Sequence, residues 1–407
     1  MPGIPAGLEL AVKRYGTRPL RDALQPAIAL AREGFVLGTA AAPIRAAAAQ
    51  LATDPASRAL YLPGGQPPAA TDRFRNPDLA RLLEALAEAN STAPLYRGEF
   101  AAQIAQAFRA GGGLVTKEDL AQYEAREVPP LTLQWDDWTV STAPLTAGGL
   151  TVLQMLAILR AAGWHERPGA AVESRALQVE AFRYAWQDRL QFLGDPQGTG
   201  SPLPELLSHE RTRAAASEIV QAVADRRPLA VRATSRPDQG TIHLSAADRA
   251  GNFVAVTLTH GGAFGARVTV PGLGLTLGHG MSRFEPTGGP NAPGPGKRPL
   301  NNMCPTVLAK RGRPVMALGG RGGRKIPNAV GEVLLQILGR GHDLAQAIAQ
   351  PRLHTEGTLA VSLEKAWPAD SRNDLELRGY KISTAASATV SAVAAGEKPG
   401  EYLTAMR

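Results

Sequence analysis

The sequence is short of cysteine and of aromatic residues, and both shortages exclude classes of protein. Cys304 is the single cysteine in 407 residues, which excludes an internal disulfide framework and a cysteine-ligated zinc site. Aromatic residues make up 5% of the chain and are rarely interleaved with the scattered basic residues. A nucleic-acid groove concentrates positive charge on one face, so the net charge of +8 does not predict a nucleic-acid partner.

Long apolar runs are missing as well. No stretch approaches the roughly 18 consecutive apolar residues of a membrane span, and the mean hydropathy is -0.13. We therefore expect no membrane span. The first five residues, Met1 to Pro5, lack the basic start and the apolar run of a secretory signal. This leaves the localisation open, with the cytoplasm as the default, unless the sequence starts late.

The first part of the chain is predicted to be mostly helical. Apolar residues recur near a 3.6-residue spacing in Ala23–Arg32, Leu79–Ala89, Phe100–Ala110, Leu150–Ala162, Val172–Phe192 and Glu205–Val223. Thr116 is expected to cap a further helix, and Leu131–Ser141 is predicted to be one strand. Taken alone, Asp188 and Arg189 are expected to be surface charges on the fifth helix.

The pattern changes near residue 225. Arg226–Gly240 is polar and without period, so it is expected to be an exposed loop. Two hairpins are predicted after it, which pair Ile242–Ala247 with Phe253–Thr259 and Pro305–Ala309 with Pro314–Leu318. The glycine-rich run from Gly319 to Gly323 then leads into a helix over Val330–Leu338. Bare N–H groups at such a helix start favour an anion or oxyanion site.

Few residues are candidates for a metal ligand or a catalytic nucleophile. His243, His260 and His279 match no common metal site, and Cys304 is expected to be a small buried residue, so we expect no metal and no cofactor. A threonine hydroxyl needs an adjacent base, which its own α-amine supplies when threonine is the first residue of a chain. Thr241 would gain that amine if the chain cut itself after Gly240.

Specific motifs extend from Thr241 to Asn328. They are Gly240-Thr241-Ile242-His243-Leu244-Ser245, Asp248 to Thr259, Pro271-Gly272-Leu273-Gly274 with Met281, Gly296-Lys297-Arg298-Pro299-Leu300 with Met303 and Pro305-Thr306, and Gly322-Gly323. With them the run resembles the small subunit of the γ-glutamyltransferase (γ-glutamyltranspeptidase) family. The first 240 residues resemble its large subunit, through Pro2-Gly3, Tyr15-Gly16, Gly98-Glu99, Glu118-Asp119-Leu120, Gly148-Gly149 and Asp188-Arg189.

The resemblance implies a fold and a mechanism. The fold is the α+β N-terminal-nucleophile hydrolase sandwich with four layers (αββα), helix-rich in its first half and hairpin-rich in its second. Regions 1–240 and 241–407 would be separated by self-cleavage and would stay together as an intramolecular heterodimer. Thr241 would be the nucleophile, hydrogen-bonded by Thr259, and the N–H groups of Gly322 and Gly323 would form the oxyanion hole.

The substrate implied by the resemblance is a small amide or peptide of γ-glutamyl type. Its acyl group would form an intermediate on Thr241 and pass to an amino acid, a peptide or water. The family normally has on the order of a hundred further residues at the front of the large subunit, where a complete core would need them.

Several positions depart from the family's pattern around the substrate site, among them Gly261 for an expected Asn and Gly280 for an expected Gln. Arg283 stands where an acid binds the substrate's α-ammonium, and Asn301-Asn302 replace paired serines. If these residues line the site, they suggest an amidohydrolase or acylase for a carboxylate-bearing acyl group without an α-amine. If the alignment slips or Arg283 faces solvent, the ordinary activity stands. An inactive relative is a further alternative.

Overall fold

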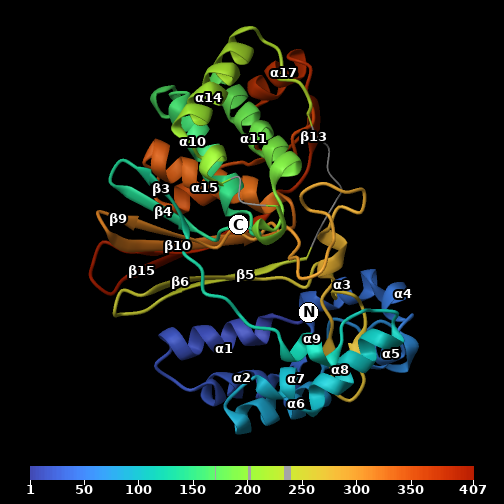
Figure 1. Ribbon diagram of the computed structural model, residues 1–407. Coiled ribbons are helices and arrows are strands. Elements are labelled where there is room, and N and C mark those ends of the chain that lie inside the picture. The colour runs from blue at the N-terminus through green and yellow to red at the C-terminus, as the bar shows by residue number, and fades with distance from the viewer. Residues whose placement is uncertain (170, 200–202, 233–239) are drawn as a thin grey trace. The chain divides into compact units, whose positions relative to one another are not determined.

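The computed structural model describes residues 1–169, 171–199, 203–232 and 240–407 (Figure 1). The described chain forms two compact units. Unit 1 comprises residues 1–128 and 260–279, and unit 2 comprises residues 129–259 and 280–407. Residues 233–239 of the expected loop Arg226–Gly240 lie outside the described residues.

Unit 1 is built from helices with two short antiparallel ribbons. Its helices are α1 (Ile4–Tyr15), α2 (Leu20–Glu33), α3 (Ala41–Ala46), α4 (Ala48–Leu51), α5 (Pro55–Tyr61), α6 (Pro77–Ala89), α7 (Ala93–Arg97), α8 (Glu99–Ala110) and α9 (Lys117–Ala121). The ribbons pair β1 (Phe35–Val36) with β2 (Arg73–Phe74), and β7 (Thr269–Val270) with β8 (Leu275–Thr276). The predicted cap is confirmed, because Thr116 and Asp119 form a reciprocal capping box at the start of α9.

Unit 2 is organised around a six-stranded antiparallel sheet in the order β15-β14-β10-β9-β4-β3. Its strands are β3 (Leu131–Trp135), β4 (Trp138–Thr142), β9 (Thr306–Lys310), β10 (Arg313–Arg321), β14 (Thr389–Ala395) and β15 (Tyr402–Met406). The single strand predicted over Leu131–Ser141 is wrong, because the chain reverses at Asp136, whose φ is +53°. Aspartate tolerates this left-handed conformation, so two residues close a hairpin.

Helices cover one face of this sheet, and a two-stranded ribbon covers the other (Figure 1). The covering helices are α10 (Gly149–Ala161), α11 (Val172–Phe192), α14 (His209–Ala224) and α15 (Lys325–Arg340). The ribbon pairs β5 (Ile242–Ala247) with β6 (Phe253–Leu258). Two neighbouring glycines of β10 show the alternation, since a Cβ on Gly319 would meet His243 of β5 and one on Gly320 would approach Ile326 of α15.

Smaller elements complete unit 2. They are α12 (Pro196–Thr199), α13 (Leu203–Leu206), α16 (Leu344–Ala349), α17 (Ala369–Leu377), and the sheet of β11 (Leu353–Thr355), β12 (Ala360–Leu363) and β13 (Lys381–Thr384). Helix and sheet are thus mixed as the α+β class requires, and the four-layer arrangement stays a prediction. None of the described helices combines the length and apolar character that a membrane crossing needs.

Helix α11 corrects the expectation for its charged pair. Fifteen of its 21 residues are buried, because α10, α14, α17 and β11 surround it. Asp188 is 0% exposed and Arg189 is 3% exposed, so neither is a surface charge. A helix buried on all sides loses the amphipathic stripe by which sequence patterns separate inner from outer positions.

Candidate active site

The backbone around Gly240 and Thr241 has the conformation that a strained junction needs. Gly240 has a φ of +111°, a region that L-residues with a side chain rarely adopt. Thr241 directly precedes β5, and the register pairs Ile242 with Leu258 across the ribbon. The ribbon therefore brings Thr241 beside Thr259, although the two are 18 residues apart in sequence.

A chain of hydrogen bonds joins these residues. The Thr241 hydroxyl donates to Thr259 Oγ1 at 3.3 Å, and the Thr259 hydroxyl donates to the carbonyl oxygen of Gly240. Arg283 Nη2 also donates to Thr259 Oγ1, at 3.4 Å. These three bonds match the one donor and two acceptor positions of a hydroxyl group. The carbonyl of the Gly240–Thr241 bond is thereby polarised from the side of Thr259.

Gly322 and Gly323 form the turn between β10 and α15. Their φ values are +139° and +63°, and a Cβ on Gly322 would come within 2.9 Å of the Ala388 backbone. Glycine is therefore required at Gly322 for a close backbone approach. Their carbonyl oxygens accept from the amides of Lys325 and Ile326 at 3.4 and 3.2 Å.

The contact between β5 and β10 relates the glycine turn to the nucleophile. His243, two residues after Thr241, packs against Gly319, three residues before Gly322. At about 3.3 Å per strand residue, both candidate groups lie within a few residues of one contact point. The oxyanion role of Gly322 and Gly323 stays a prediction.

The imidazole ring of His243 is held between two hydroxyl groups. Its Nδ1 lies 2.8 Å from Thr257 Oγ1, and its Nε2 lies 2.9 Å from Ser245 Oγ. Burial lowers its pKa to about 4, so the ring is neutral at pH 7. Over the part of the chain that the structure describes, no three His, Cys, Asp or Glu side chains gather as a metal site.

A cavity of about 370 Å³ lies beside this hydroxyl pair, and we call it the first cavity. Its lining includes Arg189, Arg283, Glu285, Asn291, Asn302 and Arg324. Three guanidiniums thus line this cavity, and one of them, Arg283, also belongs to the hydroxyl chain. Asn302 lines it too, whereas the side-chain carbonyl of Asn301 accepts from the amide of Met303 at 3.1 Å.

Asn291 holds two segments of the cavity wall together. Its Nδ2 donates to the carbonyl oxygen of Arg283 at 2.7 Å, and its Oδ1 accepts from the amide of Leu300 at 3.0 Å. Asp195, which is 4% exposed, accepts from the amide of Arg298 at 2.7 Å. The run Lys297 to Leu300, singled out as a motif, is thus placed by two buried polar side chains.

Asp188 precedes Arg189 of the cavity wall and is itself held by neighbouring side chains. Its carboxylate accepts from Arg211 Nη2 at 3.1 and 3.0 Å and from Gln154 Nε2 at 2.6 Å. The next residue, Arg189, donates from Nη2 to the carbonyl oxygen of Asn301 at 2.8 Å and to Asn302 Oδ1 at 3.2 Å. Arg189 of the first cavity is thus held by Asn301 and Asn302, and the carboxylate before it is held separately by Arg211 and Gln154.

Sequence reasoning did not assign a role to three residues of this site. Arg189, Asn291 and Arg324 line the first cavity, and only Arg189 lay in a motif that had been noticed. Arg324 follows Gly323 directly, and its guanidinium lies 3.9 Å from Glu285 and 3.7 Å from Glu356. The position of Arg324 directly after the glycine turn is a signal from which its place in the site could have been predicted.

Cys304 is fully buried, as expected. Its Sγ donates to the carbonyl oxygen of Asn302 at 3.3 Å. Burial raises the pKa of the thiol to about 12, so the thiolate required for nucleophilic chemistry is not formed near pH 7.

Known proteins resemble this chain over nearly its whole length. The family model for gamma-glutamyltranspeptidase matches residues 1–406. The glutathione hydrolase proenzyme of Escherichia coli (strain K12) is 32% identical over 401 residues, which cover 94% of this chain and 69% of that protein. The Acylase ACY 1 proenzyme of Pseudomonas sp. (strain SE83) is 32% identical over 387 residues, which cover 94% and 68%.

Among solved structures, the cephalosporin acylase from Bacillus halodurans matches with a TM-score of 0.89 at 28% identity, covering 99% of this chain and 75% of that chain. The relatives thus carry the names of hydrolases and of acylases, and two of the names say proenzyme. The resemblance seen in the sequence is confirmed, and the chain belongs to the gamma-glutamyltranspeptidase family.

Proposed function

We propose that the chain cuts its own Gly240–Thr241 bond and then uses Thr241 to cleave amides through an acyl-Thr241 intermediate. The observation that carries the proposal is the hydrogen-bond chain from the Thr241 hydroxyl through Thr259 to the Gly240 carbonyl oxygen. That chain aligns a nucleophile and an oxyanion donor on one bond. The proenzyme names of the relatives support it.

The proposed self-cleavage needs no cofactor, because the Thr241 and Thr259 hydroxyl groups and water suffice. Thr241 Oγ1 attacks the carbonyl carbon of Gly240, and the Thr259 hydroxyl stabilises the oxyanion. The C–N bond then breaks, the proton lost by the Thr241 hydroxyl is taken up by the Thr241 nitrogen, and Gly240 is held as an ester on Thr241 Oγ1. Water hydrolyses this ester, which leaves a carboxylate on Gly240 and a free α-amine on Thr241.

The new α-amine provides the base for turnover. With an ordinary pKa of about 7.7–8.0, it can accept the Thr241 hydroxyl proton at neutral pH. The hydroxyl then attacks the carbonyl of the substrate amide, with the N–H groups of Gly322 and Gly323 proposed to hold the oxyanion. The leaving amine takes the proton, and water or an amine acceptor such as an amino acid or peptide removes the acyl group.

The sheet supports the proposal that the two fragments stay together. β4, before the cut, pairs with β9, after it, over five residue pairs from Trp138↔Lys310 to Thr142↔Thr306. Helices from both sides of Thr241 also share one buried core. Fragments 1–240 and 241–407 would therefore remain one heterodimer, which we propose to have the four-layer fold of the family.

Arg283 favours a second, narrower function. An α-ammonium placed about 4 Å from a guanidinium costs about 4 kcal/mol at an effective dielectric near 20, or about a thousandfold in affinity. The first cavity holds three guanidiniums, and its carboxylate Glu285 lies near Arg324. We therefore propose that the preferred acyl group bears a carboxylate and no α-amine, which the fork of Arg283 can grip.

Intact-mass analysis tests the first proposal. We expect the purified wild-type protein to separate under denaturing conditions into fragments 1–240 and 241–407, and Thr241→Ala to stay as one chain without amidase activity. Thr241→Ser keeps a hydroxyl and should still be cut. An uncut wild-type chain would contradict the mechanism and favour an inactive relative.

A matched pair of anilides tests the second proposal. Glutaryl and γ-glutamyl p-nitroanilide differ in the α-amine alone, and we expect the glutaryl compound to be cleaved with the higher kcat/KM. Arg283→Asp should shift the ratio toward γ-glutamyl, whereas Arg313→Asp, an exposed control on β10, should not. A wild-type preference for γ-glutamyl would return the protein to the ordinary activity of its relatives.

A further inference from the structure

A second cavity of about 370 Å³ lies in unit 2 among α11, α15 and the segment before β11. We call it the second cavity, and its lining includes Trp164, Arg175, Gln178, Arg340, Arg352 and Trp367. Glu332, Gln336 and Arg340 place it along the middle and the end of α15, whose start follows the glycine turn. None of the mechanism above uses it.

Arg352 brings unused donors to this cavity. It is 2% exposed, and its Nη2 donates to the main-chain oxygen of Arg407 at 3.0 Å. Its Nη1 and Nε are buried without a hydrogen-bond partner among the described residues, although Nε lies 4.0 Å from Glu364. A buried charged donor without a partner is costly, so it favours a ligand that accepts hydrogen bonds.

Two further arginines lie against indole rings. The guanidinium of Arg175 sits 4.9 Å from the ring centre of Trp367, and that of Arg340 sits 3.9 Å from that of Trp164. Nε of Arg175 and Nε1 of Trp367 are also buried and unpartnered within the described chain. Burial lowers the pKa of Arg340, and the positive charge of Arg175 lowers it further.

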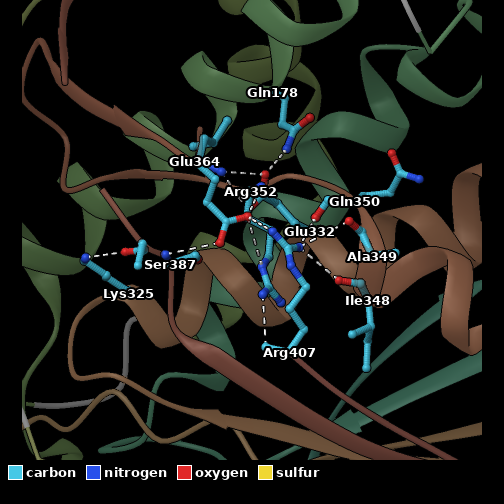
Figure 2. A network of polar contacts seen from close by, with 12 residues as sticks. Gln178, Lys325, Glu332, Ile348, Ala349, Gln350, Arg352, Glu364, Ser387 and Arg407 are labelled. Atoms are coloured by element: carbon cyan, nitrogen blue, oxygen red, sulfur yellow. Dashed lines mark hydrogen bonds and ion pairs between the residues drawn. The ribbon is translucent and has the colours of Figure 1, made fainter. Parts of the chain in front are cut away.

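The carboxylates nearby are already occupied. Figure 2 shows Glu332 and Glu364 with their partners. Glu332 accepts from Gln178 Nε2 at 2.8 Å and from the amide of Leu353 at 3.0 Å, while Glu364 is ion-paired with Arg407. Burial also raises the pKa of Glu332 well above its usual range, which reduces its negative charge.

The balance is therefore positive. Four guanidiniums, from Arg175, Arg340, Arg352 and Arg407, face two carboxylates in this region. The unpartnered atoms of Arg175, Arg352 and Trp367 are all donors. Guanidinium forks match the oxygens of a carboxylate or a phosphate, and indole faces suit a small organic body.

We propose that the second cavity binds a small organic or inorganic oxyanion, bearing a carboxylate or a phosphate, at a site separate from the hydroxyl pair of Thr241 and Thr259. The oxygens of the ligand would accept from Arg352, Arg175 and the Trp367 indole. The proposal does not depend on self-cleavage or on amidase activity.

Calorimetric titration of the full chain with three probes tests it. Succinate and inorganic phosphate represent the two oxyanions, and succinamide is the neutral match of succinate, all at an ionic strength fixed with chloride. We expect one saturable site per chain for succinate or phosphate, and none for succinamide. Whichever oxyanion binds more tightly identifies the ligand class, and no saturable binding below about 10 mM, a limiting free energy of only a few kcal/mol, would overturn the proposal.

Variants assign the site. Arg175→Gln should weaken binding about tenfold or more, because a charge-assisted hydrogen bond is lost. Since Arg352 is buried and its loss can prevent folding, Trp367→Phe provides the second variant, which removes one donor and keeps the ring. Arg283→Gln in the first cavity and the exposed Arg313→Gln should leave this binding unchanged. Binding that is lost in Arg283→Gln and retained in Arg175→Gln would overturn the proposal.

Discussion

The two cavities of unit 2 have the same volume of about 370 Å³ and three arginines each, yet their guanidiniums are held differently. In the first cavity, polar side chains hold them: Arg324 lies by Glu285 and Glu356, and Arg189 by Asn302. Tryptophan rings lie against arginines of both cavities: Arg189 and Arg324 lie over Trp186, Arg175 lies over Trp367, and Arg340 lies over Trp164. What differs is the kind of acceptor, since Arg340 and Arg352 of the second cavity donate to main-chain carbonyl oxygens, including those of Trp164 and Arg407.

Neither volume nor the number of arginines distinguishes the two cavities. The first cavity differs because one of its arginines, Arg283, donates to Thr259, which in turn accepts from Thr241. No such hydroxyl pair contacts the arginines of the second cavity among the interactions of the described residues. We therefore expect chemistry at the first cavity and binding alone at the second.

The largest effect is expected from removing Asp188, the buried residue that precedes Arg189 of the first cavity. Its carboxylate is 0% exposed and holds Arg211 and Gln154, so Asp188→Ala leaves a charge without its partner. We expect a loss of about 3–5 kcal/mol in the free energy of unfolding, measured by urea denaturation. Asp370→Ala, at an exposed position of α17, is the control and should change little. Equal stability of the two variants would show that the network around Asp188 is dispensable.

The next largest effect is expected at the hydrogen-bond chain of Thr241 and Thr259, to which an arginine of the first cavity is joined. Thr259→Ala removes the donor to the Gly240 carbonyl, and we expect self-cleavage to slow about 10²–10³-fold. Thr259→Ser retains the donor and should be cut at nearly the wild-type rate. Mass spectrometry after timed synthesis measures the rates, and equal cleavage of the Ala and Ser variants would refute the role of this hydroxyl.

Gly319→Ala tests the packing behind the nucleophile at a smaller scale. A Cβ there would lie 2.3 Å from Cε1 of His243, whose ring is fixed by Thr257 and Ser245. We expect a destabilisation of about 1–3 kcal/mol. His243→Ala removes the obstructing ring, so the double variant should lose less than the sum of the single losses. Simple additivity would mean that the strands do not meet at this point.

The smallest effect at any one pH is expected at the second cavity. The raised pKa of Glu332 means that the native carboxyl keeps its proton at pH values where the unfolded chain has lost it, above about 4.5. Wild-type stability should therefore fall as the pH rises from about 4.5 toward the native pKa, by at most about 1.4 kcal/mol per pH unit. Glu332→Gln lacks this dependence, so its stability relative to wild type should increase over that range.

Urea denaturation across this pH range measures the difference. The lowered pKa of His243 acts in the opposite direction, since it costs stability as the pH falls from about 6.5 to about 4. Both proteins contain His243, so its contribution cancels between them. A constant difference between Glu332→Gln and wild type would show that Glu332 stays ionised.

Local signals in the sequence predicted the local parts of the fold. The capping box at Thr116, both hairpins of the second half and most of the long helices depend on spacings of a few residues and are present. The helix expected over Glu205–Val223 is divided into α13 and α14, because Ser208 caps a new helix start. The reversal at Asp136 was missed because a two-residue turn within a run of strand formers hardly disturbs the pattern. The burial of Asp188 was missed because it depends on helices distant in sequence.

For the site, too, local features could be predicted and features that join distant segments could not. The hydrogen bond between Thr241 and Thr259 follows from a hairpin and from a resemblance, so it could be anticipated. That Arg189 and Arg324 line the same cavity as Arg283 could not be anticipated, because they come from α11 and from the turn before α15. The roles of Gly322, Gly323 and Asn302 remain predictions.

The pairing of β4 with β9 has a consequence for the lifetime of the protein. Residues 138–142 and 306–310 meet across about 170 positions of chain, and a contact of that range forms slowly even while the chain is continuous. Once the chain is cut between them, reunion of separated fragments would depend on their concentration, since each must find the other by diffusion. An unfolded mature molecule would then seldom return. Its persistence would be governed by how rarely the sheet opens rather than by an equilibrium with an unfolded form.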